Sequence, residues 1–109
     1  MNLKEVFAQL GSLPIEEERS VSEDYLEVVF LNKESGNWNK ALSGIFGPAV
    51  KPAGQAPSSE DDALTSDFGG VFDNQTLFRK DMDGRCMIAM FWPWQDKEHT
   101  TLKMALLKK

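Results

Sequence analysis

Cys86 and His99 are the only thiol and the only imidazole in the chain, and a cysteine–histidine dyad needs them within hydrogen-bond reach. If the last hairpin is centred on Gln95 and Asp96, His99 lies opposite Trp92, roughly 20 Å from Cys86 at about 3.3 Å per strand residue. A register shift of two residues does not close that gap. We therefore expect Cys86 to act as a small buried hydrophobe, and we assign no catalytic residue.

Asp81 and Asp83 are a pair of nearby carboxylates that could do acid and base work. Asp-x-Asp-Gly is also similar to the start of a calcium loop, but that loop needs glycine at its sixth position, and here glycine is fourth. Asp-Gly between two β-prone runs is instead typical of a hairpin turn. One cysteine excludes a zinc site made of several cysteines, and the glycines lack phosphate-loop spacing. We expect no metal and no cofactor.

The net charge of the chain and its distribution limit the classes of partner that we expect. The net charge is −5, and residues 1–67 hold 12 acidic against 5 basic side chains, whereas residues 68–109 hold 5 against 7. An acidic protein repels phosphate backbones, so single-strand nucleic-acid binding through the basic residues of the second half ranks last. Those residues are Arg79, Lys80, Arg85 and Lys103. Without a long apolar run, the chain is expected to be cytoplasmic and not to enter a membrane.

The first half of the chain predicts two helices and one strand. Apolar residues recur at helical spacing over residues 3–10, and the acidic stretch at residues 16–18 is interpreted as solvated linker. Residues 25–31 have the β propensity of a buried strand. A second apolar stripe begins at Trp38 and ends before Gly47-Pro48, as a helix does.

Residues 47–70 form the longest irregular stretch, with three prolines and four glycines. Loops longer than about 12 to 15 residues are uncommon unless they are functional or disordered, so a short helix is expected to begin near Ser59. The remainder predicts three antiparallel strands at residues 76–80, 85–92 and 99–107. The whole chain, residues 1–109, is therefore predicted to be one α+β domain. Its expected form is a two-layer sandwich with about four strands and two helices.

The strand at residues 85–92 is apolar on both alternating faces, with Ile88, Met90 and Trp92 on one of them. Two helices can shield only one face of a small sheet. The other face must be covered by the long loop, a second subunit or a partner protein. The turn Trp92-Pro93-Trp94 provides an aromatic platform, and the segment at residues 48–52 is proline-rich enough to dock on it. We expect self-docking, in which the long loop at residues 47–70 folds over the Trp turn.

These features favour a noncatalytic binding module over an enzyme. The expected partner is another protein or a second copy of the chain, bound through Ile88, Met90, Trp92 and Trp94. The alternative is a small-molecule-binding protein or enzyme with a pocket under the 47–70 loop. Its candidate polar contacts, grouped by sequence position alone, are Asp67, Asn74, Gln75, Arg79 and His99.

Overall fold

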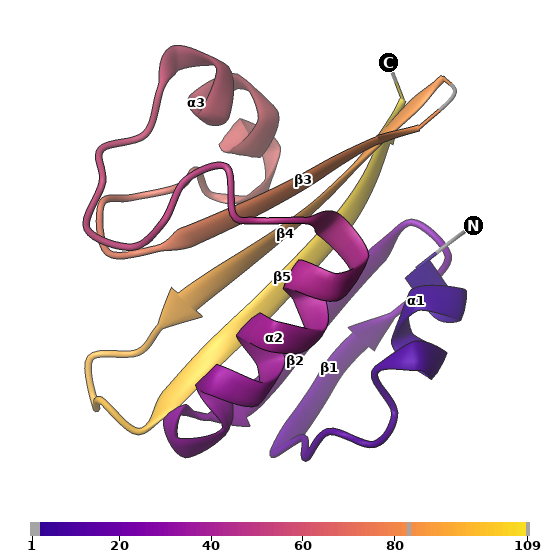
Figure 1. Cartoon of the computed structure of the whole chain (residues 1–109), viewed down its shortest axis with the longest axis vertical. Coiled ribbons are helices and arrows are strands. Elements are labelled where there is room, and N and C mark those ends of the chain that lie inside the picture. Colours follow the sequence, from indigo (N-terminus) through magenta and orange to yellow (C-terminus); the bar gives the residue numbers. More distant parts are fainter. Residues whose placement is uncertain (1–2, 83, 109) are drawn as a thin grey trace.

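The chain folds as an α+β domain around one antiparallel sheet with strand order β1-β2-β5-β4-β3 (Figure 1). The computed structural model describes residues 3–82 and 84–108. In chain order the elements are α1 (Leu3–Gln9), β1 (Glu17–Val21), β2 (Tyr25–Leu31), η1 (Asn32–Glu34), α2 (Ser35–Phe46), α3 (Ser59–Thr65), η2 (Ser66–Phe68), β3 (Thr76–Met82), β4 (Arg85–Pro93) and β5 (His99–Lys108). The predicted α+β fold class is confirmed, and the described residues form one strand and one α-helix more than the four strands and two helices expected.

The C-terminal half is the predicted meander. Asp81 pairs with Cys86 across the first hairpin, and Trp92 pairs with Thr101 across the second. Strand β2 joins the meander through β5, from Tyr25 opposite Ala105 to Leu31 opposite His99. The strand at residues 25–31 therefore lies beside the meander.

The interpretation of residues 16–18 as linker is wrong for Glu17 and Glu18, which open the edge strand β1. Glu17 pairs with Val29 and Glu18 with Val28, and the register shifts before Ser20. Both glutamate side chains remain exposed, as the charge pattern indicated. An edge strand of this kind is held by backbone hydrogen bonds and leaves its charged side chains in water, so no apolar alternation marks it in the sequence.

Helix α2 covers the first face of the sheet and crosses in front of it in Figure 1. Its buried stripe is Trp38, Leu42 and Phe46. Trp38 stacks on Phe30 of β2, with ring centroids 5.1 Å apart. Burying each such side chain contributes about 1.5 to 3 kcal/mol, which is why the apolar spacing of α2 decides how it packs.

The second face is covered by the chain itself. Leu64 of α3 and Phe68 of η2 pack against a buried cluster that includes Leu77, Ile88 and Met90. A capping box at the start of α3 begins the helix near Ser59, as predicted. Arg79 of β3 pairs with Glu60 of α3 and so ties this cover to the sheet.

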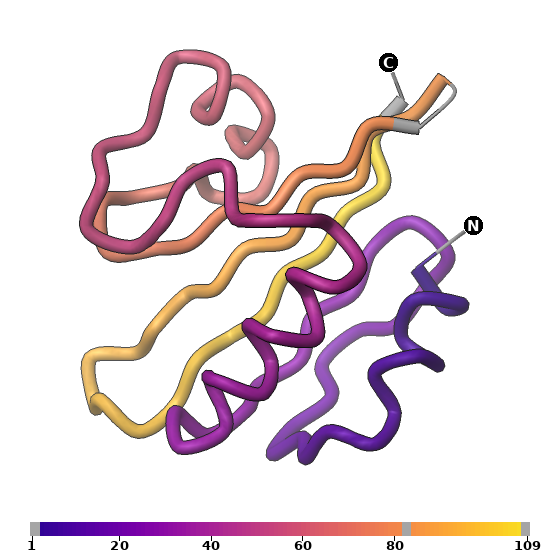
Figure 2. The backbone as a smooth tube through the Cα atoms, viewed as in Figure 1, coloured from indigo at the N-terminus to yellow at the C-terminus, as the bar shows by residue number. Residues whose placement is uncertain are grey.

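The proline-rich segment takes a different place from the one predicted. Residues 47–58 pass from α2 around the β3 edge to α3 (Figure 2). Lys51 forms an antiparallel bridge with Leu77 there. The aromatic ring of Trp92 meets Gly69 and Phe72 instead. The long segment thus covers the second face through its helical end, while Val50 and Lys51 bond to Leu77 at the sheet edge.

Replacing Ile88 by alanine tests this cover. Ile88 has no exposed surface, so Ile88→Ala should lower the free energy of unfolding by about 2 to 5 kcal/mol in urea denaturation. Val50→Ala is the control, because Val50 is 47% exposed and its truncation should cost less than about 0.5 kcal/mol. Equal losses for the two variants would contradict the docking of α3.

Candidate ligand-binding groove

A groove of about 540 Å³ opens on the first face, between the start of α2 and the segments around Ala53 and Asn74. Its floor is aromatic. Phe30 and Phe91 line it and meet edge to face with centroids 5.5 Å apart. Phe30 is also stacked on Trp38 of α2, so packing in the core holds the floor in place.

The rim of the groove is polar and uncharged. Helix α2 provides Ser35, Gly36 and Asn39, while the polar side chains from η1 and the strands include Asn32 and Thr100. Thr100 Oγ1 donates a hydrogen bond to Asn32 Oδ1 at 2.6 Å, and Ser43 Oγ donates to Asn39 Oδ1. None of the described residues that line the groove is ionisable.

The wall opposite α2 depends on a lysine that sequence reasoning missed. Lys51 has no exposed surface, and burial lowers its pKa below the ordinary lysine value. Its ammonium donates to the backbone carbonyls of Pro52, Asp73 and Gln75. A lysine inside a proline- and glycine-rich stretch carries no local signal of burial, since two of its three partners, Asp73 and Gln75, lie more than twenty residues away.

The predicted partner-binding residues differ in burial: two are fully buried, and the two tryptophans are half-buried. Ile88 and Met90 have no exposed surface under α3 and η2. Trp92 is half-buried, with the Lys103 ammonium 3.7 Å from its ring centre. Trp94 stacks on His99 and donates from Nε1 to Thr101 Oγ1. The rings of the two tryptophans therefore have different neighbours.

Of the predicted pocket residues, only Asn74 lines the groove. Asp67 is exposed in η2, and Gln75 is buried, where its Oε1 accepts a hydrogen bond from the Phe72 N–H. Arg79 is paired with Glu60 and Asp81. His99 lies at the start of β5. The structure does not bring these five residues together.

The possible catalytic pairs identified in the sequence are not assembled. Cys86 lies opposite Leu107, eight residues along β5 from His99, which is roughly 25 Å at about 3.3 Å per residue. Burial raises the pKa of the Cys86 thiol, which disfavours the reactive thiolate. Of the carboxylate pair, Asp83 lies outside the described residues.

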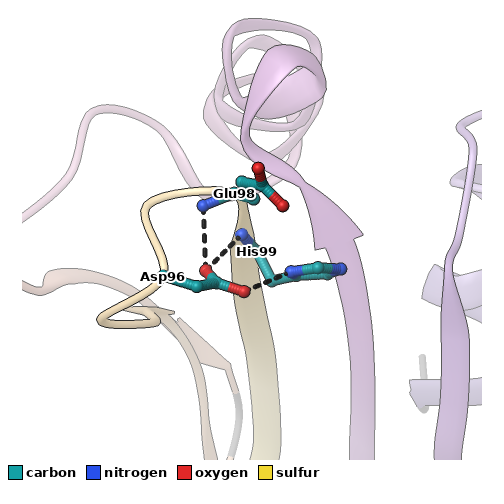
Figure 3. A group of neighbouring side chains, drawn as sticks. All are labelled: Asp96, Glu98 and His99. Atoms are coloured by element: carbon teal, nitrogen blue, oxygen red, sulfur yellow. Dashed lines mark hydrogen bonds and ion pairs between the residues drawn. The ribbon is translucent and has the colours of Figure 1, made fainter.

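Asp96, Glu98 and His99 form the one group in the described chain whose ligand atoms, all within 4.8 Å of one another, could hold a metal ion (Figure 3). The Asp96 carboxylate is already engaged. Oδ1 accepts the N–H groups of Glu98 and His99 at 2.8 and 3.1 Å, and Oδ2 lies 2.6 Å from His99 Nδ1. These bonds, that to the Glu98 N–H first, lower the pKa of Asp96. Through these bonds the Asp96 carboxylate stabilises the turn between β4 and β5.

Comparisons with protein families, curated proteins and solved structures found no match for this chain. Among the described residues, no helix is both long and apolar enough to cross a bilayer.

Replacing Asp96 by alanine tests its role in the turn. Asp96→Ala removes the acceptor of two backbone N–H groups, so its Tm should fall at pH 7, whereas Asp67→Ala, at an exposed η2 position, should leave Tm unchanged. Because the folded-state pKa of Asp96 is lowered, its stabilisation is present above the ordinary carboxyl pKa and is lost as pH falls through the lowered value. The Tm difference between wild type and Asp96→Ala should therefore shrink in acid. A difference that grows there would refute this role.

Proposed function

We propose that this protein is a noncatalytic binding module that holds a small, uncharged, hydroxyl-bearing molecule in the groove beside α2. One observation supports this proposal above the others: an aromatic floor is ringed by neutral amides and hydroxyls, with no ionisable group among the described lining residues. The volume of about 540 Å³ lies within the range of ligand sites.

The chemistry of the lining favours a neutral ligand. A charged group brought into the groove would lose its hydration and find no opposite charge there, which costs free energy. Asparagine amides and threonine hydroxyls both donate and accept hydrogen bonds, as the hydroxyl groups of sugars and nucleosides do. Phe30 is fully buried and Phe91 is 6% exposed, so the apolar surface open to the ring of such a molecule comes mainly from Ala53 and Pro93.

The protein-interaction hypothesis becomes the second candidate, because the apolar face on which it rested is occupied by α3 and η2. A contact between Arg19 and Trp94 now favours the protein-interaction hypothesis. The Arg19 guanidinium lies 5.4 Å from the centre of the Trp94 ring, and arginine and tryptophan are the residue types enriched at interface hot spots. A protein partner or homodimer bound there would leave the groove free.

Thermal shift measurements separate the two candidates. Adenosine and phenyl β-glucoside are suitable neutral probes, and their phosphorylated counterparts are matched charged probes. A neutral probe at 100 times its Kd should stabilise the fold by about 2.7 kcal/mol, and the phosphorylated form should stabilise it less at the same concentration. No shift with any neutral compound, together with melting that depends on protein concentration, would support the partner hypothesis instead.

Placing a charge on the groove rim gives a second test. Asn39→Asp puts a carboxylate into the lining, and it should weaken binding of the neutral probe at least about tenfold, or 1.4 kcal/mol. Asn37→Asp is the matched control, because it makes the same change at an exposed position of the same helix outside the groove. Isothermal titration calorimetry measures both. Equal affinities for the two variants would place the bound probe elsewhere.

A further inference from the structure

Lys51 is a buried ammonium whose three N–H groups have three separate backbone acceptors. Nζ lies 3.2 Å from the Pro52 oxygen, 3.1 Å from the Asp73 oxygen and 2.5 Å from the Gln75 oxygen. The side chain has no exposed surface. An ammonium is the one common side-chain group with three donors and no acceptor at a single atom, so this set of carbonyls matches it fully.

These acceptors frame the groove wall. Ala53, which follows Pro52, lines the groove, and so does Asn74, which lies between Asp73 and Gln75. One ammonium thus joins two segments separated by some twenty residues, and each segment contributes a lining residue. The backbone adds to the connection, because the Gly54 N–H donates to the Asp73 oxygen at 2.7 Å.

We propose that Lys51 is the positioning residue of the groove: its ammonium sets the spacing and direction of the wall that carries Ala53 and Asn74, and so decides which ligands fit. This inference rests on the proposed function of the groove. Lys51 itself is not among the lining residues, so it acts through the backbone that it holds.

The physical basis is the loss of a shared donor. Without the ammonium, the carbonyls of Pro52 and of the buried residue Gln75 lose the donor that joins them, while the Asp73 oxygen keeps only the Gly54 N–H. A buried acceptor without a donor is unfavourable, so the chain is expected to move until water reaches it. Residues 52–58 have few other ties to the sheet, so they are the part that can move. Asp73 and Asp61 are the acidic side chains that favour the charged lysine, against the opposing effect of burial.

Lys51→Met tests the proposal, because methionine keeps the length and apolar volume of the side chain but removes every donor. In hydrogen exchange, the Gly54 amide should exchange about tenfold faster or more, while amides of the β2–β5 ladder keep their wild-type rates. In NMR spectra, the side-chain amide signal of Asn74 should shift. Titration with phenyl β-glucoside should show at least about a tenfold weaker Kd.

Lys80→Met is the matched control. Lys80 also donates from Nζ to a backbone carbonyl, that of Ile45, but it lies outside the groove lining. This variant should keep the exchange rate of Gly54 and the affinity for phenyl β-glucoside. Lys51→Arg, which retains the charge and several donors, should recover part of the protection that methionine loses.

The outcomes separate the two proposals. If wild-type protein binds no neutral probe, the proposed function fails; exchange at Gly54 still decides whether Lys51 holds the wall. If Lys51→Met binds the probe as wild type does, or leaves Gly54 exchange unchanged, the positioning role is overturned. Should Lys51→Met fail to fold, wild-type exchange decides: a Gly54 amide that gains no protection when phenyl β-glucoside binds also overturns it.

Discussion

Strand β4 lies inside the sheet with both of its faces apolar, and both have to be shielded from water. Met87 and Ala89 face the layer formed by α1 and α2, while Ile88 and Met90 face the other side. Because one layer of helices covers only one face of a sheet, the chain must supply a second cover. The path of residues 47–75 follows from this requirement, since α3 and η2 have to be carried from the α2 side to the opposite side.

This path creates the groove. The chain leaves α2 at Gly47, runs along the β3 edge and returns to β3 after η2. Its two passages meet at Lys51, which bonds to both of them. On the first face they stop short of the start of α2, so Phe30 and Phe91 are left as the floor of a groove. The ligand site that we propose is thus a consequence of how the second face is covered.

Several of the described chemistry-bearing side chains outside the groove are engaged in structural contacts. Asp96 orders the β4–β5 turn, Arg79 holds α3 through Glu60, and Cys86 is part of the second buried cluster. Glu27 accepts hydrogen bonds from Tyr25 and Arg19 on the sheet surface. The groove lining, in contrast, combines an apolar floor with amides and hydroxyls, which is the composition expected of a site for a neutral molecule.

The fold class, the meander and the apolar stripe of α2 could be predicted from residue types alone, because apolar periodicity and turn residues such as Asp-Gly act over a few residues. The sequence also indicated that β4 needs cover on both faces and that a helix begins near Ser59. The folded structure was needed to show that α3 provides this cover, that Glu17 and Glu18 pair in an edge strand, and that Lys51 is buried. It also selected Asn74 alone from the predicted pocket residues. These outcomes depend on contacts between segments far apart in the chain, such as Lys51 with Gln75, and no local pattern of residue types encodes such contacts.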